Sequence, residues 1–526
     1  MKKTMRQHSF ASRLKSLALA FGITLAFASC ANEEIAQNAN GKDYDANLTT
    51  FSTGDPTTRT SMESNGTFYW ESGDKIWVKD DNGAWQQSSN APTEKTASFE
   101  FKVPGKFTKS STYKVYYPGK NGNQDQVSIV ANQSQAEPNS TAHFGTAGDC
   151  GMADAAWSNA KNGFAFTLDH KAAYLLFLPR TANTILHDCY LTKVEVNSDN
   201  DITSTYTLDP TTGELTGTGT GKQITVSTGG SGTYANGFPL TNNATSAATN
   251  GAYVVIKPGT HILKIRYWVK DVATGVEGTI TKTLSSATYD QNKYYNITAN
   301  LDVKNYDGDH YYMWDAQQQY WYGYEWTRHL SGNTGQPTLN YNSSSNYPQS
   351  NSDVSRWYNE SYPGYGVSNP AIHTSCKDLP NVNEMTWYAA KGEPRWDGDE
   401  LWTTMGHLYK GGMWFKKKTN ISGFNPNTAE DGTDWRTNVN VRSWSVSQTL
   451  PSTADANKYF YLPALGDYDN GRQKYVGSHD APYGMYWSSS ANPRNSNFAY
   501  CLYFLGGNIY VDDEIRYSGY RAEAFL

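Results

Sequence analysis

The chain has 526 residues, a formal net charge of −6 at pH 7 and an aromatic content of 14%, to which 38 tyrosines contribute most. So small an acidic excess argues against a dedicated nucleic-acid binder, which shows a basic face. A tyrosine-rich composition with many Gly, Asn, Ser and Thr residues favours a β-rich extracellular protein, and the length suggests two to four domains.

The first thirty residues have the pattern of a secretory signal. A basic start is followed by an apolar run from Leu17 to Ala28 that is too short to cross a bilayer. The run ends in Ser29-Cys30, which resembles a lipoprotein signal. We therefore expect residues 1–30 to be a lipoprotein signal peptide with Cys30 as the lipidation site. Ordinary signal cleavage beside a bystander cysteine is the alternative.

Residues 31–56 are polar and are expected to form a linker. Glu33 and Glu34 lie just after Cys30, and such an acidic pair resembles the tag that directs lipoproteins of some gut Gram-negative bacteria to the outside of the outer membrane. The expected location is therefore the cell surface, with a lipid anchor in the outer membrane. A plain solvated linker would explain the same residues.

The next 246 positions, 57–302, alternate apolar and polar residues between turns rich in Gly, Asn and Thr. This period of two is typical of antiparallel strands, so the sequence predicts two β-sandwich domains, at 57–150 and 151–302. The stretch 164–179 is more continuously apolar and predicts a strand that is buried on both faces.

Several segments of this region resemble the fimbrillin family, namely Arg59–Ser61, Phe68–Trp70, Gly73–Val78 and Phe164–Phe166. Fimbrillins are the subunits and the tip or anchor proteins of type V pili. The resemblance implies binding to other pilus subunits by strand donation, in which backbone hydrogen bonds complete an open sheet edge. It also implies that Arg59 is a site of maturation cleavage, whereas an ordinary turn arginine is the simpler interpretation.

Residues 305–526 differ in character, because eleven of the sixteen tryptophans lie here and the valine alternation fades. Short helices are expected at 383–390 and at 400–409, the second closed by Gly411-Gly412. Four segments follow: Tyr461–Gly466, Gly484–Ser490, Ala499–Phe504 and Asn508–Val511. They resemble the C-terminal half of a C-type-lectin fold of the formylglycine-enzyme-like branch. More narrowly, they resemble the variable proteins that retroelements diversify. The expected fold is therefore mainly β with an α+β C-terminal part.

Strand alternation in 499–504 and 508–512 places Leu502, Ile509 and Val511 inside and directs the intervening side chains outward. Rigid strands that display Tyr, Asn and Arg have the chemistry of an antibody-like surface. Each candidate could equally be an ordinary surface residue. The candidate ligand-binding residues are Asn492, Arg494, Asn495, Asn497, Phe498, Tyr503, Leu505, Asn508, Tyr510, Asp512, Asp513 and Tyr517.

The end of the chain, Gly519–Leu526, departs from the terminal strand of retroelement-diversified proteins, which leaves active diversification open. Besides Cys30, the cysteines are far apart and lack zinc spacing, so no metal or cofactor is expected. One or two disulfides remain open, and the sequence cannot pair them. The remaining cysteines are Cys150, Cys189, Cys376 and Cys501.

Enzymatic and calcium-binding interpretations are weaker. A formylglycine-generating enzyme needs a reactive cysteine pair in a local motif that is missing here, and Ser488–Ser490 lacks a nucleophile elbow. Asp397, Asp399 and Glu400 could suggest a glycosidase, but their spacing favours the start of a helix. Asp512–Glu514 could offer oxygens to calcium, yet successive side chains on a strand point to opposite faces.

We therefore expect a protein without catalytic residues: a cell-surface, pilus-associated adhesin whose C-terminal domain binds a protein or glycan ligand on host or neighbouring cells. The first alternative is a structural pilus anchor or tip without ligand binding. The second is a glycan-active enzyme.

Overall fold

The computed structural model describes residues 48–53, 61–62, 68–306, 308–322, 370–404, 406–469, 472–474, 482–495 and 497–525. The predicted signal peptide, the predicted lipidation site Cys30 and the predicted cleavage site Arg59 lie outside these residues. Residues 47–526 form one compact unit. No helix in the described part combines the length and the apolarity needed to span a bilayer.

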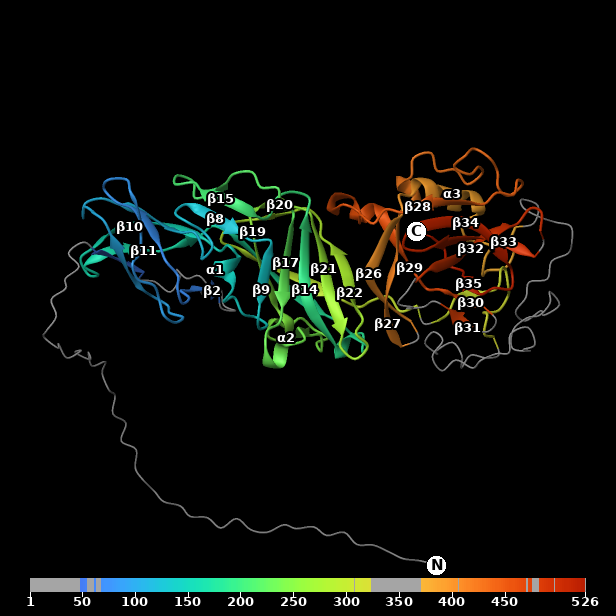
Figure 1. Cartoon of the computed structure of the whole chain (residues 1–526), viewed down its shortest axis with the longest axis horizontal. Helices are drawn as coiled ribbons and strands as arrows, with labels where there is room; N and C mark the ends of the chain where they lie inside the picture. The colour runs from blue at the N-terminus through green and yellow to red at the C-terminus, as the bar shows by residue number, and fades with distance from the viewer. Residues whose placement is uncertain are drawn as a thin grey trace, which may run out of the picture. The chain divides into compact units, whose positions relative to one another are not determined.

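The described chain is built mostly of β-strands arranged in sandwich-like sheets (Figure 1), so the prediction of a mainly β protein is confirmed. The first sheet has the strand order β5-β4-β7-β10-β11-β1-β6, with β12 paired to β10. Its strands are β1 Leu48–Thr53, β4 Trp77–Lys79, β5 Trp85–Gln87, β6 Glu100–Pro104, β7 Tyr113–Tyr117, β10 Gly151–Ser158, β11 Gly163–Phe166 and β12 Asp169–His170; a two-stranded sheet pairs β2 Ser61–Met62 with β3 Phe68–Tyr69.

Strand β1 falls inside the predicted linker 31–56, so that prediction is wrong for residues 48–53. The strand lies between β6, which it pairs with antiparallel, and β11, which it pairs with in parallel. Phe51 is fully buried and stacks on Phe164, with ring centroids 5.0 Å apart. A polar stretch that contains a single well-placed aromatic residue thus completes an aromatic core.

A nine-stranded sheet follows, with the order β29-β27-β26-β22-β21-β14-β17-β9 and with β18 paired to β14. A core of Leu, Val, Ile and Tyr side chains joins it to the three-stranded sheet β19-β13-β24. The strands are β9 Asn132–Gln135, β13 Ala173–Arg180, β14 Cys189–Ser198, β17 Gln223–Thr228, β18 Phe238–Pro239, β19 Ala252–Ile256, β21 Leu263–Asp271, β22 Glu277–Thr283, β24 Tyr294–Asn300, β26 Arg395–Thr404, β27 His407–Lys416 and β29 Tyr459–Pro463.

Smaller elements complete this part. The continuous strand predicted at 164–179 is divided among β11, β12 and β13, of which β13 is buried along most of its length. The small elements are β8 Gln126–Ile129, β15 Ser204–Leu208, β16 Leu215–Thr216, β20 Gly259–His261, β23 Ala287–Tyr289, α1 Phe144–Ala147 and α2 Ala247–Asn250.

The predicted boundary at residue 150 does not separate the sheets. Strands β8 and β9 precede it, yet they pair with β15 and β17. Strands β10 to β12 follow it, yet they belong to the first sheet. The chain therefore crosses three times between the two parts, after β7, after β9 and after β12, which local strand patterns cannot reveal.

The C-terminal sheet has the order β25-β35-β32-β33-β34-β28. Its strands are β25 Tyr311–Tyr312, β28 Arg442–Ser445, β32 Gly484–Ala491, β33 Phe498–Phe504, β34 Asn508–Ile515 and β35 Tyr520–Arg521, and a further pair joins β30 Asp467–Asp469 to β31 Arg472–Lys474. Helix α3, Val382–Lys391, packs on β32, β33 and β34, and it matches the helix predicted at 383–390.

The helix predicted at 400–409 is wrong, because these residues form the β26–β27 hairpin. Gly406 has φ +78° in the turn, a left-handed conformation that suits glycine. Asp397 and Glu400 do not begin a helix. They meet partners from the preceding sandwich instead: Asp397 accepts from Arg266, and Glu400 accepts from Thr281.

Candidate recognition surface

The candidate ligand-binding residues lie on β33, β34 and the turns around them. The strands pair antiparallel, with Tyr503 opposite Tyr510 and Cys501 opposite Asp512. The core-facing positions behave as predicted, since Leu502, Ile509 and Val511 are fully buried. These strands therefore form a stiff frame for the side chains that alternate with the core residues.

Helix α3 supports this frame from behind. Asn381 accepts a hydrogen bond from the Glu384 N–H at 3.1 Å, and the Glu384 side chain accepts one from the Asn381 N–H at 2.9 Å. This capping box fixes the start of the helix. Met385 and Tyr388 are buried in the same core as the inward residues of β33 and β34.

Three tyrosines form the centre of the surface. The rings of Tyr503 and Tyr510 stack with centroids 5.2 Å apart, and the ring of Tyr483 meets Tyr503 edge-on at 5.5 Å. Tyr503 and Tyr510 are each half-buried. Packing restricts their rings while part of each stays in contact with solvent, which is the property that makes tyrosine effective in binding surfaces.

Acidic side chains continue the surface along β34. Asp512 and Glu514 share the face of Tyr510 and are half-buried. Burial raises the pKa of both carboxyl groups, and each pKa is raised further by a neighbouring acid. Such groups favour a partner that donates hydrogen bonds or carries positive charge.

The loop that leads into β33 is held by asparagine side chains. Asn492 is 3% exposed; its Oδ1 accepts from the Arg494 N–H at 2.7 Å and the Asn495 N–H at 2.9 Å, and its Nδ2 donates to Asp513 at 2.8 Å. The expectation that Asn492 points to solvent is therefore wrong, because the loop uses all of its polar atoms. Arg494, Asn495 and Asn497 are exposed as expected.

The other candidates are half-buried. They comprise Phe498 at the start of β33, Leu505 and Asn508 in the turn that joins the strands, Asp513, and Tyr517. The Leu505 N–H donates to the Asn508 carbonyl at 3.0 Å, which closes the turn. Tyr517 packs against a separate aromatic cluster that includes Tyr320 and Tyr468.

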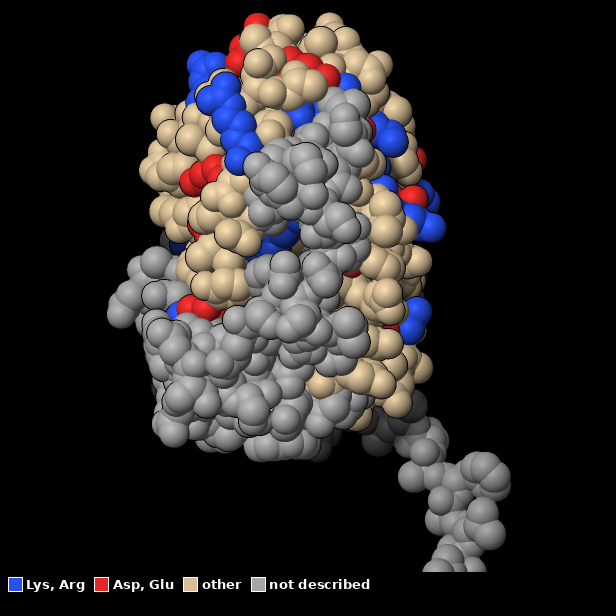
Figure 2. Space-filling view, turned by 90° about the vertical axis from the view of Figure 1, so that its right-hand side faces the viewer, with Lys and Arg blue, Asp and Glu red and all other residues tan. Residues whose placement is uncertain are grey.

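Charge is mixed over the described residues on the side of the molecule that Figure 2 draws. Figure 2 shows basic and acidic side chains interspersed among uncharged ones over the described residues of this view. Within the described part of the chain, no group of three or more His, Cys, Asp or Glu side chains has the arrangement of a metal site. Asp512–Glu514 thus does not form a calcium cluster in this structure.

The four described cysteines are free and buried. Cys376 lies near His373 and Asp315. Its sulfur accepts a hydrogen bond from the Asp315 N–H at 3.2 Å, and burial raises the pKa of the Cys376 thiol to about 12. Burial also raises the pKa of Cys501 well above its usual value. Both thiols are therefore protonated at neutral pH.

No family model matches the sequence, and no curated protein matches it. Solved structures with similarity include a candidate cell adhesion protein from Bacteroides ovatus, at 15% identity and a TM-score of 0.29 over 48% of this chain and 93% of the other. The fimbrial anchor protein Mfa2 from Porphyromonas gingivalis is 11% identical, with a TM-score of 0.21 over 45% of this chain and 82% of the other. A fimbrial protein from Bacteroides ovatus is 10% identical, with a TM-score of 0.25 over 88% of this chain and 99% of the other.

Proposed function

We propose that this chain is a lipid-anchored, cell-surface adhesin of the fimbrillin type, in which a C-terminal lectin-like domain binds a protein or glycan ligand. The observation that carries the proposal is the tyrosine surface of β33 and β34. Tyr503 and Tyr510 are stacked and half-buried; one side of their strands fills a core, and Tyr503 also packs against a second core that contains Cys501. A surface that is ordered before binding loses little conformational entropy when the ligand arrives.

The exposed loop residues extend this surface with adaptable polar groups. Arg494 and Asn497 lie on a loop whose backbone is held by the side chains of Asn492 and Asn495, so their own side chains can change without disturbing the strands. This separation of a fixed frame from variable positions would suit the diversified binding proteins that the sequence resembles. A reverse transcriptase gene beside a near-copy of the 3′ end of this gene would support diversification, and its absence would contradict it.

Ligand binding is tested with the whole mature chain, because β26 pairs with β22 and so joins the C-terminal part to the preceding sandwich. Arrays of glycans and of host surface proteins should give signals that Tyr503→Ala and Tyr510→Ala abolish. Tyr294→Ala is the matched control, since Tyr294 is 46% exposed on β24, outside this surface. If every array signal survives both changes, the proposed surface does not bind a ligand.

Pilus association is the second candidate function, and the position of β1 favours it. This strand precedes Arg59 in the sequence and occupies the space between β6 and β11. Cleavage after Arg59 would detach a strand that only non-covalent contacts then hold. Co-purification of pilus subunits with the wild-type chain, but not with Arg59→Ala, would support a structural role in a pilus.

The proposed anchor is tested separately. Cys30→Ala should prevent incorporation of labelled fatty acid and should release the protein from the outer membrane fraction. Protease treatment of intact cells should degrade the wild-type chain if it faces outward.

A further inference from the structure

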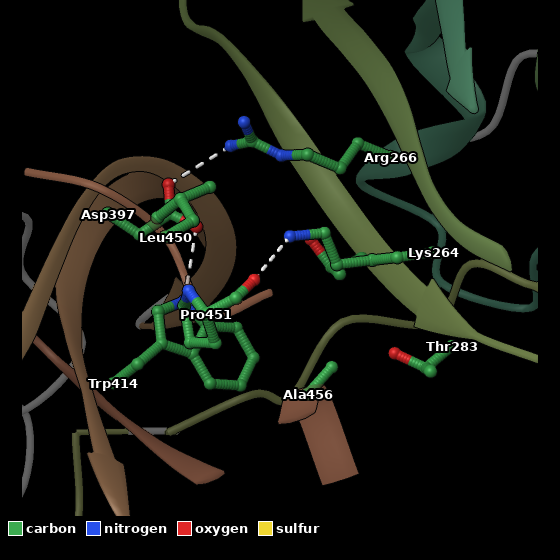
Figure 3. Close-up of a pocket in the computed structure, with 9 residues that line it drawn as sticks. Lys264, Arg266, Thr283, Asp397, Trp414, Leu450, Pro451 and Ala456 are labelled. Atoms are coloured by element: carbon green, nitrogen blue, oxygen red, sulfur yellow. Dashed lines mark hydrogen bonds and ion pairs between the residues drawn. The ribbon is translucent and has the colours of Figure 1, made fainter. Parts of the chain in front are cut away.

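Two basic side chains on the outer face of β21 are buried without belonging to the core. Lys264 is 9% exposed and Arg266 is 8% exposed, and they alternate with Ile265 and Tyr267, which point into the sandwich core. The segment at Pro451 and strand β26 cover them: Lys264 donates to the Pro451 carbonyl at 2.8 Å, and Arg266 donates to Asp397 at 3.1 Å. In Figure 3 both basic side chains extend from the strand toward these partners.

A cavity of about 80 Å³ lies against these side chains, and a groove of about 800 Å³ shares part of its wall. The cavity is large enough for several waters or a carboxylate group. The groove adds amide, hydroxyl and charged side chains of both signs. The shared residues are Lys264, Arg266, Leu450 and Pro451; the cavity adds Trp414 and Thr283, and the groove adds Glu195, Asp199, Asn197, Ser198, Thr220 and Lys222.

The basic groups keep donors that the protein does not use. An ammonium group has three donors, and the described residues supply Lys264 with one acceptor, the Pro451 carbonyl, and with no carboxylate partner. The Nη2 of Arg266 serves Thr279 and Asp397, but its buried Nε–H has no hydrogen-bond partner. Buried donors without acceptors are unfavourable, so an incoming acceptor would be stabilised here.

We propose that this cavity binds the carboxylate of an acidic sugar, a uronic or sialic acid unit of a glycan, whose ring extends into the groove. Two cationic side chains, Lys264 and Arg266, and one anionic side chain, Asp397, line the cavity. Arg266 also lies 4.0 Å from Asp399, so a ligand carboxylate would pair with Lys264, which has no carboxylate partner among the described residues. Because Asp397 and Asp399 lie close by, a singly charged carboxylate meets less repulsion from them than a doubly charged phosphate would. The half-buried indole of Trp414 offers an apolar wall for a sugar ring.

This site is independent of the tyrosine surface. Lys264 and Arg266 lie on β21 of the nine-stranded sheet, while Tyr503 and Tyr510 lie on β33 and β34 of the C-terminal sheet. Variants at one site therefore leave the other intact, and the two proposals fail separately.

The test is titration calorimetry of the full chain with 3′-sialyllactose and with a galacturonic acid trisaccharide. Lactose is the neutral counterpart, and sodium sulfate tests a bare anion. Both acidic sugars should bind, lactose should not, and Lys264→Met should weaken binding about tenfold or more, since a charge-assisted hydrogen bond is lost. Lys270→Met, on the same strand but outside the cavity, should bind as the wild type does.

A second variant keeps the proposal testable if Lys264→Met does not fold. Thr283 is exposed at the cavity wall, so Thr283→Asp should fold normally, pair with Lys264 and exclude an anion; Ser286→Asp, exposed nearby on the same chain segment, is its control. Equal binding by Thr283→Asp and Ser286→Asp would overturn the proposal. So would binding of lactose as tight as that of sialyllactose, binding of sulfate alone, or no binding of either acidic sugar.

Discussion

Tyr503 on β33 and Tyr510 on β34 lie directly opposite each other in the antiparallel pair, and their rings stack at 5.2 Å with planes inclined by 22°. Strand neighbours with stacked rings restrain each other, so neither tyrosine needs a ligand to hold its orientation. The pairing also predicts that the two side chains depend on each other energetically.

A double-mutant cycle measures this dependence without any ligand. Tyr503→Ala and Tyr510→Ala should each lower the free energy of unfolding, and the double variant should lose less than the sum, with a coupling of about 0.5–1.5 kcal/mol. Urea unfolding followed by tryptophan fluorescence gives the three values. Tyr503→Ala combined with Tyr294→Ala, on a distant sheet, should be additive. Additive effects for the stacked pair would show that the rings do not support each other.

The capping box of α3 gives a second prediction, on the support behind the strands. Asn381→Ala removes the acceptor for the Glu384 N–H and should cost about 1 kcal/mol of stability. Asn381→Asp keeps an acceptor and should cost less. Asn438→Ala, at an exposed position, should change stability by less than about 0.5 kcal/mol. A cost for Asn381→Ala no greater than that of Asn438→Ala would contradict the role of the cap.

Sequence patterns predicted correctly the parts of the fold that depend on residues close together in the chain. Strand alternation predicted that Leu502 and Val511 would be buried, and the short helix predicted at 383–390 is observed as α3. The helix start predicted from Asp397 and Glu400 is wrong, because the partners of these carboxylates, Arg266 and Thr281, are more than a hundred positions away. A carboxylate that begins a helix and one that meets a distant arginine look alike in sequence.

The candidate sites show the same limit. Alternation placed Tyr503 and Tyr510 on the face opposite Leu502 and Val511, but it could not show that Tyr503 packs against a second core or that Asn492 turns inward to hold a loop. Lys264 and Arg266 looked like ordinary outward residues of a strand. Only the fold brings Pro451 over them, since Lys264 and Pro451 are 187 positions apart.

Asp467 gives a pH-dependent prediction. This carboxyl group is 5% exposed, and burial is the main cause that raises its pKa to about 7; Asp469 and Glu514 raise it further, while the hydroxyl of Tyr483, at 2.6 Å, and Lys474 lower it. The folded state therefore keeps a proton that the unfolded state releases above its ordinary value of 3.8. The stabilisation is complete below that value and is lost as pH rises through about 7.

In Asp467→Asn the free energy of unfolding should fall less as pH rises, because an amide stays neutral and still accepts a hydrogen bond from Tyr483. The wild type should lose up to about 4 kcal/mol through this group between pH 4 and pH 8. Glu400, whose pKa burial also raises to about 7, should leave a residual slope in the variant. Thermal melts across this range give the comparison, with Asp209→Asn as the control, because hydrogen bonds from Thr212 and Thr211 lower the pKa of Asp209. Identical pH profiles for wild type and Asp467→Asn would show that Asp467 is ionised in the folded state.

The position of β1 gives the last prediction, which separates strand donation from a simple stalk. Phe51 is fully buried, stacks on Phe164 and meets Phe107 edge-on at 5.1 Å. Loss of β1 would expose this contact and would leave backbone groups on both β6 and β11 without partners. A chain that begins at residue 60 should therefore be less stable, by more than the 3–5 kcal/mol typical of a buried Phe→Ala change.

A synthetic peptide of residues 47–54 should bind the shortened chain and raise its melting temperature, because it can restore both strand pairings in trans. The same peptide with Phe51→Asp should have no effect, and the full chain should not bind the wild-type peptide, since its own β1 fills the space. If the shortened chain melts as the full chain does and does not bind the peptide, the first sheet needs no strand between β6 and β11. Strand exchange at this position could then not join the chain to pilus subunits, and the protein would act as an adhesin held only by its lipid anchor.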